Sequence, residues 1–195
     1  MLIAAALAWA GSAQAQGVDW GRAGGALFVG GAPAAPAEAA MPDGGPHVPA
    51  LRQPYADAVA VAASRYGIDP KLLHALVAVE SAYRPDALSP AGAGGLTQLM
   101  PGTARALAVR DRFDPADSLL GGAAYLAGQI LRFRDLRLAL AAYNAGPSRV
   151  AALGHVPDVR ETRGFVAAVI DCYLTLTVGR GVRSAKDCRA EGAVE

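Results

Sequence analysis

The chain has 195 residues, of which 53% are hydrophobic and 18% are charged, with a formal net charge of +1. This length suits one domain with an additional segment. The near balance of charge excludes the basic stripe of a nucleic-acid-binding protein, and no acidic block predicts a solvating tail. Because only 6% of the residues are aromatic, we expect a core of Ala, Leu and Val side chains on packed helices.

The N-terminal region has the pattern of a signal peptide over residues 1–15. Residues 2–10 are apolar, and the run "AQA" that ends at Ala15 is a small-x-small cleavage site. The apolar run is too short to span a bilayer. The n-region lacks Lys and Arg, so an uncleaved apolar membrane anchor is the alternative. Residues 16–51 are rich in Gly, Ala and Pro and predict a flexible linker. We therefore expect a periplasmic or secreted protein without a membrane-spanning segment after signal cleavage.

The rest of the chain has the pattern of helices with clear boundaries. Asp69-Pro70 and Asp114-Pro115 each combine an N-cap residue with a proline at the first helical position. Alternating strand patterns are absent, so the sequence predicts an all-α domain. The expected helices cover residues 54–67, 70–83, 101–109, 115–133, 136–146, 148–153 and 161–178. The domain is expected over residues 52–180, followed by a C-terminal tail over residues 181–195.

Glu80 lies within the apolar stripe of the helix expected over residues 70–83. At about 100° per residue, its direction falls among those of the leucines and valines of this helix. Lys71, His74 and Ser81 fall on the other face. The periodicity therefore predicts that Glu80 points inward.

An inward carboxylate destabilises the fold unless it is paired, hydrogen-bonded or protonated. One interpretation is a structural ion pair with Arg84 or Arg105. The other is a carboxyl group whose pKa is raised by desolvation, so that it can donate a proton. Such a group suits a general acid that cleaves a glycosidic bond.

Two nearby features support a binding site around Glu80. Three glycines within residues 92–95 allow tight turns and close approach of the backbone to a ligand, and Gln98 follows them. No Gly-Lys-Ser/Thr run follows, so this is not a phosphate-binding loop. Further on, Tyr143 and Asn144 place an aromatic ring, a phenol and an amide at an expected helix end. A capped helix end with Tyr143 in the core is the alternative interpretation.

Cys172 and Cys188 are the only two cysteines, and the three histidines have no ligand spacing, so we expect no metal site and no cofactor. In an exported protein the pair is expected to form a disulfide that attaches the tail to the last helix. Two unpaired thiols are the alternative.

Four motifs together resemble those of the SLT-type lytic transglycosylases. The stretch "ESAYRPDALSPAGAGGLTQLMPGTA" is similar to their Glu-Ser motif, glycine loop and following helix. "GGAAYLAGQI" resembles their Gly-x-x-Tyr-Leu helix, "LALAAYNAGPSRV" their Ala-Tyr-Asn-Ala-Gly-Pro motif, and "ETRGFV" their Glu-Thr-Arg-x-Tyr-Val motif. These motifs occur in the family's order over residues 52–175.

The resemblance implies a lysozyme-like, goose-type α domain that acts on the glycan strands of peptidoglycan. It implies cleavage of the β-1,4 bond between N-acetylmuramic acid and N-acetylglucosamine without water, which leaves 1,6-anhydro-muramyl ends. Glu80 lies at the position of the catalytic acid/base. The positions that line the sugar groove or lie near it in the family correspond here to Ser89, Gln98, Met100, Tyr143, Asn144 and Glu161. Small relatives often serve a wall-spanning secretion, conjugation or pilus complex, which is the partner class expected by analogy.

The chain departs from the family pattern at three positions. Thr97 stands where the family usually has Met, Ser118 where it usually has Asn, and Phe165 where it usually has Tyr. We expect the first two to alter packing and capping, and the third to remove a hydroxyl group. Two other functions share parts of the pattern: a muramidase or chitinase on the same fold, and a non-catalytic glycan-binding module.

Overall fold

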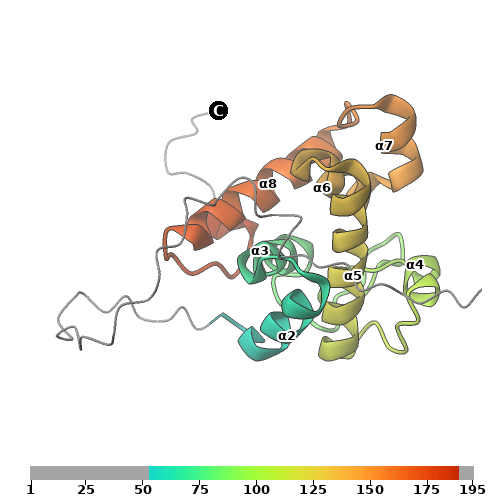
Figure 1. Cartoon of the computed structure of the whole chain (residues 1–195). Helices are drawn as coiled ribbons and strands as arrows, with labels where there is room; N and C mark the ends of the chain where they lie inside the picture. Colours follow the sequence, from blue (N-terminus) through green and yellow to red (C-terminus); the bar gives the residue numbers. More distant parts are fainter. Residues whose placement is uncertain (1–52, 189–195) are drawn as a thin grey trace, which may run out of the picture. The chain divides into compact units, whose positions relative to one another are not determined.

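The computed structural model describes residues 53–188 (Figure 1), so the expected signal peptide and linker lie outside the described residues. Between these bounds the only β-structure is two isolated bridges, both at Gly94, which confirms the all-α expectation. The same part of the chain contains no helix with the length and hydropathy needed to cross a bilayer. The helices are α2 (Ala56–Tyr66), α3 (Pro70–Glu80), α4 (Pro101–Ala106), α5 (Pro115–Phe133), α6 (Leu136–Ala145), α7 (Pro147–Leu153), α8 (Arg160–Thr177) and the 3-10 helix η1 (Ala185–Cys188).

The Asp-Pro pairs begin helices as expected. The Asp69 carboxylate accepts a hydrogen bond from the backbone N–H of Lys71 at 2.8 Å, and the Asp114 carboxylate accepts one from the backbone N–H of Asp117 at 2.9 Å. Each bond satisfies a backbone donor that the first helical turn leaves free. The prolines then supply a backbone angle that suits the first turn. The start of both helices could therefore be located from the sequence.

Helix α3 ends at Glu80, three residues before the expected boundary. Ala82 and Tyr83 adopt left-handed backbone angles, with φ of 49° and 60°. Two consecutive non-glycine residues in this region store strain, which the surrounding structure must compensate. Glu80 is thus the last residue of the helix and lies directly before a strained turn.

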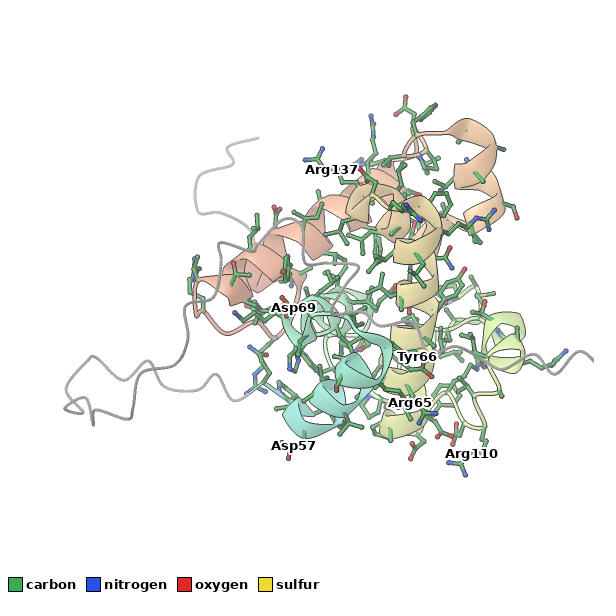
Figure 2. All side chains as sticks on the ribbon, viewed as in Figure 1. Asp57, Arg65, Tyr66, Asp69, Arg110 and Arg137 are labelled. Atoms are coloured by element: carbon green, nitrogen blue, oxygen red, sulfur yellow. A yellow bond between two sulfur atoms is a disulfide. The ribbon has the colours of Figure 1, made fainter. Side chains whose placement is uncertain are left out.

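Helix α3 is the centre of the core, with seven consecutive buried residues from Leu72 to Ala78. It packs against α2 and α8, and α8 also crosses α6 (Figure 1). Figure 2 shows side chains filling the space between these helices, while Asp57 and Arg137 lie at the outside. A helix that is enclosed on all sides has no polar face towards solvent.

The predicted outward orientation of His74 and Ser81 is therefore wrong, because both side chains are buried. The Nδ1 atom of His74 lies 3.0 Å from the Tyr83 hydroxyl, which also donates to the His74 carbonyl at 3.2 Å. Burial lowers the pKa of His74 to about 4, so the ring is neutral at neutral pH.

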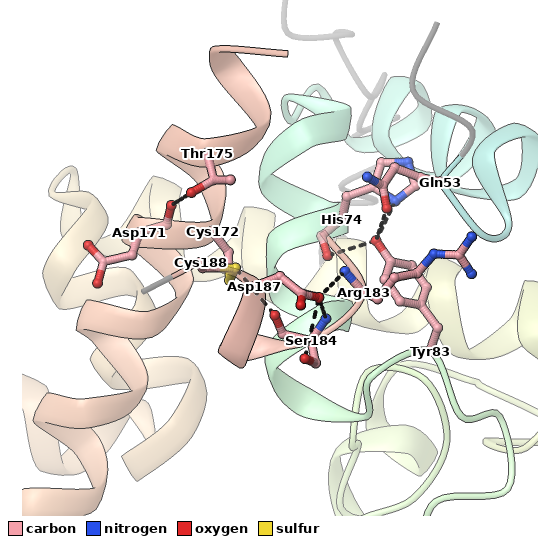
Figure 3. The surroundings of a disulfide bond; sticks show 10 residues. All are labelled: Gln53, His74, Tyr83, Asp171, Cys172, Thr175, Arg183, Ser184, Asp187 and Cys188. Atoms are coloured by element: carbon pink, nitrogen blue, oxygen red, sulfur yellow. Dashed lines mark hydrogen bonds between the residues drawn. A yellow bond between two sulfur atoms is a disulfide. The ribbon is translucent and has the colours of Figure 1, made fainter. Parts of the chain in front are cut away.

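A disulfide joins Cys172 in α8 to Cys188 in η1 (Figure 3). The segment between them returns to the core, because Val182 is fully buried. With its amide oriented to satisfy its neighbours, Gln53 donates to the Val182 carbonyl at 2.6 Å and accepts from the Val182 N–H at 2.9 Å. Residues 181–188, the first part of the expected tail, thus pack as part of the domain.

Candidate active site

Glu80 is a half-buried residue at the C-terminal end of α3. Desolvation by burial raises the pKa of Glu80 to about 8. The negative end of a helix dipole also disfavours a carboxylate at this position. Glu80 is therefore mostly protonated at neutral pH.

Neither Arg84 nor Arg105 forms a salt bridge with Glu80. Within residues 53–188 the salt bridges join Arg110 to Asp117 and Arg163 to Asp158. The Arg84 guanidinium instead donates to the carbonyl of Ser81 at 3.1 Å. The structural ion pair that the sequence left open is thus absent within the described residues, and no salt bridge offsets the desolvation of Glu80.

Ser81 attaches the end of α3 to the glycine loop. Its hydroxyl donates to the Leu96 carbonyl at 2.9 Å, and the Ser81 side chain is almost fully buried. The loop is held further by Gln98, whose side-chain nitrogen donates to the carbonyls of Ala87 and Gly95 at 3.0 and 2.9 Å. These bonds fix the loop beside Glu80, so the site is largely formed before a ligand binds.

A pocket of about 270 Å³ lies between this loop, α4, α5 and the end of α6. We call it the tyrosine pocket. It is lined by Gln98, Leu99, Met100, Thr103, Tyr125, Tyr143, Asn144, Ala145 and Gly146. Four of the sequence-predicted residues are among them, and none of the lining residues is acidic.

The two tyrosines stack at an angle, with ring centroids of Tyr125 and Tyr143 5.0 Å apart. The buried Tyr143 hydroxyl donates to the Thr97 carbonyl at 2.9 Å. Desolvation raises the pKa of Tyr143, and the charge of Glu80 raises it further. Glu80 is therefore a neighbour of Tyr143, which lines the tyrosine pocket.

Three predicted residues, Glu80, Ser89 and Glu161, do not line the tyrosine pocket. The Ser89 hydroxyl accepts a hydrogen bond from the Ala93 N–H at 3.0 Å and shapes the loop. Glu161 is exposed in the first turn of α8. Five lining residues were not predicted from the sequence, and two of them, Thr103 and Tyr125, have polar side chains; the others are Leu99, Ala145 and Gly146. Tyr125 could have been predicted, because it is the tyrosine of the Gly-x-x-Tyr-Leu motif. That motif was used only to identify a helix.

Two of the three departures from the family pattern touch each other. The Thr97 hydroxyl donates to the Ser118 carbonyl at 2.8 Å, and the Thr97 N–H donates to the Ser118 hydroxyl at 3.3 Å. Both side chains are fully buried. The pair thus fixes the residue whose carbonyl receives the Tyr143 hydroxyl bond. Phe165 is half-buried against the core and does not line the tyrosine pocket.

Within the described residues, no group of three or more His, Cys, Asp or Glu side chains is placed to hold a metal ion. The polar side chains that line the tyrosine pocket are those of Gln98, Thr103, Tyr125, Tyr143 and Asn144, of which Gln98 and Tyr143 already form internal hydrogen bonds.

Comparison with known proteins identifies the family. The model of the transglycosylase SLT domain matches residues 57–160. A transglycosylase of Enterobacteria phage PRD1 is 39% identical over 93 residues, which are 48% of this chain and 35% of the phage protein. The membrane-bound lytic murein transglycosylase F of Alcanivorax borkumensis is 39% identical over 113 residues, or 54% of this chain and 23% of that protein.

Solved structures agree with this result. The complex of the 70 kDa soluble lytic transglycosylase with bulgecin A aligns with a TM-score of 0.58 and 29% identity, covering 71% of this chain and 26% of that one. An inactive Glu-to-Gln mutant of the lytic transglycosylase Slt from Pseudomonas aeruginosa aligns with a TM-score of 0.55 and 30% identity, covering 67% and 26%. The chain spans only about a quarter to a third of these proteins. Because the family model matches more than half of its residues, the chain belongs to the transglycosylase SLT domain family.

Proposed function

We propose that this protein is a peptidoglycan lytic transglycosylase with Glu80 as its single catalytic acid and base. The observation that carries the proposal is the partly buried Glu80, which has no salt-bridge partner within residues 53–188 and whose pKa is raised by desolvation, together with a tyrosine pocket whose lining contains no acid. A glycosidase that hydrolyses its substrate through paired carboxylates needs a second acid near the bond. A transglycosylase does not, because a hydroxyl group of the substrate replaces water.

The proposed reaction uses one carboxyl group twice, first as an acid and then as a base. Protonated Glu80 donates its proton to the glycosidic oxygen, the bond from C1 of the muramic sugar to that oxygen breaks, and N-acetylglucosamine leaves with a free 4-hydroxyl. Positive charge develops at C1. Ionised Glu80 then accepts the proton of the 6-hydroxyl of the muramic sugar as that oxygen attacks C1. The new C1–O6 bond gives the anhydro end, and Glu80 is again protonated.

The tyrosine pocket supports sugar binding. Its two aromatic rings offer apolar surface, and Asn144 offers an amide that can donate and accept. Gln98 and Ser89 support the pocket by holding the glycine loop. The names of the relatives support murein as the substrate, and the Glu-to-Gln mutant of the Pseudomonas aeruginosa enzyme is described as inactive.

Analysis of the products tests the proposal. Purified sacculi digested with the protein should release muropeptides with 1,6-anhydro-muramyl ends, detected by mass spectrometry as products 18 Da lighter than hydrolysed ones, about one water molecule. Reducing ends would instead show a muramidase. Binding to sacculi without any release of fragments would show a non-catalytic module.

We propose further that the protein acts outside the cytoplasm. The support is the apolar run over residues 2–10 with the cleavage pattern that ends at Ala15, together with a disulfide, which persists in oxidising compartments. N-terminal sequencing of the exported protein should begin at Gln16. A wall-spanning secretion, conjugation or pilus complex is the proposed partner class, and co-purification from cross-linked envelopes tests it.

A further inference from the structure

A second pocket, of about 390 Å³, lies on the other flank of α4; we call it the arginine pocket. It is formed by Pro101, Ala104 and Arg105 of α4 and by the segment 109–113. Thr103 of the same helix lines the tyrosine pocket. Residues 101, 104 and 105 share one side of a helix, and residue 103 lies on another side. The six-residue helix α4 is therefore the wall between the two pockets.

Three arginines line the arginine pocket, and their guanidinium groups differ in the contacts that they make. Arg110, at the outer edge of the molecule (Figure 2), forms a salt bridge with Asp117 at 3.1 Å. Arg112 donates through Nη1 to the carbonyls of Gly92 and Leu99, each at 2.8 Å. Both of these guanidinium groups already have partners.

Arg105 differs, because its exposed side chain makes no hydrogen bond or salt bridge with residues 53–188. Its guanidinium can therefore bind an anion without first breaking an internal contact. Asp111 lines the same pocket, and one of its oxygens accepts from the Phe113 N–H at 2.8 Å. The other oxygen remains an acceptor for an N–H or ammonium group.

The base of the arginine pocket is continuous with the glycine loop. A Cβ atom at Gly94 would lie 3.0 Å from the Phe113 ring, and one at Gly95 would collide with the Arg112 carbonyl, so the loop and this segment are closely packed. The ring is nevertheless 40% exposed and presents an apolar face to the pocket. Because Arg112 joins the loop to this segment, the pocket is held in a fixed position relative to Glu80 and the tyrosine pocket.

The groups around the arginine pocket match a short acidic peptide. A guanidinium binds a carboxylate through charge-assisted hydrogen bonds, a ring packs on aliphatic carbons, and a free carboxylate oxygen accepts from an amine or amide. Peptidoglycan carries such peptides as stems on its muramic sugars, next to the bond that the proposed reaction breaks. We propose that the arginine pocket binds the peptide stem of a sugar held near the tyrosine pocket, with Arg105 as the residue that recognises a stem carboxylate. This inference rests on the proposed function for the identity of the glycan.

Binding to the Glu80→Gln variant tests the proposal without turnover. The ligands are glycan strands that keep their stems and equal-length strands from which an amidase has removed them. We expect the strands with stems to bind about three- to tenfold more tightly, the range of one partly exposed charge-assisted bond. Adding Arg105→Gln should abolish this difference and leave binding to the bare strands unchanged. Adding Arg180→Gln, which removes an exposed arginine outside the arginine pocket, should leave the difference intact.

A third ligand separates the stem carboxylates from other anions. Strands whose stem carboxylates have been amidated should bind like bare strands, and an anionic wall polymer bearing phosphates should not compete. Equal binding of bare and stem-bearing strands, or a stem preference that survives Arg105→Gln, would overturn the proposal. Competition by the phosphate polymer would also overturn it in favour of a general anion site. The two proposals are tested by different experiments. Missing anhydro products from the wild-type chain would contradict the proposed function, whereas the binding measurements alone decide whether the arginine pocket recognises a stem.

Discussion

At the scale of single residues, the position of Glu80 explains how one acid can serve both steps of the proposed reaction. Desolvation keeps its carboxyl group protonated before the bond breaks, and no arginine holds it in the ionised form. The developing positive charge at the sugar then favours the ionised form. The same side chain therefore changes its protonation state in response to the substrate, as a general acid that becomes a base must do.

Replacing Glu80 by Gln should remove activity and keep the fold. The amide has nearly the same shape but cannot donate a proton to the leaving oxygen, so turnover of sacculi should fall by about two to four orders of magnitude. Turbidity of a sacculus suspension measures the loss, and circular dichroism checks the fold. Asp86→Asn, in an exposed turn of the loop, is the control and should keep its activity. Full activity of Glu80→Gln would contradict the assignment.

The raised pKa of Glu80 also predicts a pH dependence of the reaction. The active form of the free enzyme has this carboxyl protonated, so kcat/KM should be level below about pH 8 and fall about tenfold per unit above it. Initial rates on sacculi between pH 5 and 10 give this profile. A rate that stays constant up to pH 9.5 would show that proton donation by this group does not limit the reaction.

The same group should reduce stability at alkaline pH. Its pKa in the fold, about 8, exceeds the ordinary value of 4.5, so the folded state binds more protons between these values. The stability present below about pH 4.5 is therefore lost as the pH rises through 8. Glu80→Gln should then be more stable than wild type at pH 8.5, by on the order of 1–3 kcal/mol after allowance for partial exposure. Urea titrations at pH 5 and 8.5 compare the two proteins, and an equal difference at both pH values would contradict the linkage.

At the scale of secondary-structure elements, two glycines of α5 allow it to lie against the loop that carries the site. A Cβ atom at Gly122 would collide with the Thr97 side chain, and one at Gly121 with Val109 and Leu99. Gly128, in the same helix, has open space around its Cα. Gly121 and Gly122 are therefore required for close packing of α5, whereas Gly128 is not.

This difference predicts opposite effects of the same substitution. Gly122→Ala should destabilise the protein by about 1–3 kcal/mol, because the added methyl group pushes on the buried Thr97. Gly128→Ala should stabilise it by up to about 1 kcal/mol, because alanine has the higher helix propensity. Thermal unfolding of both variants measures the change. If Gly122→Ala were as stable as wild type, the contact between α5 and the loop would be looser than the structure shows.

The sequence predicted the positions of the helices more accurately than it predicted which side of each helix is buried. The Asp114-Pro115 pair predicted the start of α5, since the chain itself supplies the capping hydrogen bond, and the expected end at residue 133 is also confirmed. The predicted orientation of side chains on α3 was partly wrong. His74 and Ser81 are buried because they form hydrogen bonds with Tyr83 and Leu96, which lie outside this helix, and no local pattern predicts such contacts. Within the site, motifs indicated Tyr143 and Asn144. The coupling of Thr97 to Ser118 and the position of Glu161 outside the tyrosine pocket depend on packing between helices, so only the three-dimensional structure gives them.

At the scale of the whole domain, the disulfide joins the last helix to a segment that closes the core. Gln53, at the start of the described chain, binds the backbone of Val182, and its side chain also lies 3.3 Å from the Tyr83 hydroxyl. Tyr83 belongs to the strained turn after Glu80. The two ends of the domain therefore meet at the turn that follows Glu80, and the disulfide attaches the C-terminal segment to α8.

Removing the disulfide should lower stability and also affect catalysis. For a closed loop of 16 residues the expected loss is about 3 kcal/mol, measured by urea unfolding of the Cys172→Ala/Cys188→Ala double variant at 25 °C. Reductant should shift wild type towards the double variant and leave the variant itself unchanged. Because residues 181–188 then hold Gln53 and Tyr83 less tightly, kcat should fall while KM stays nearly constant, at a temperature where the variant is still folded. Unchanged kcat in a folded, less stable variant would limit the role of the disulfide to stability and show that the turn after Glu80 is held by α3 and the glycine loop alone.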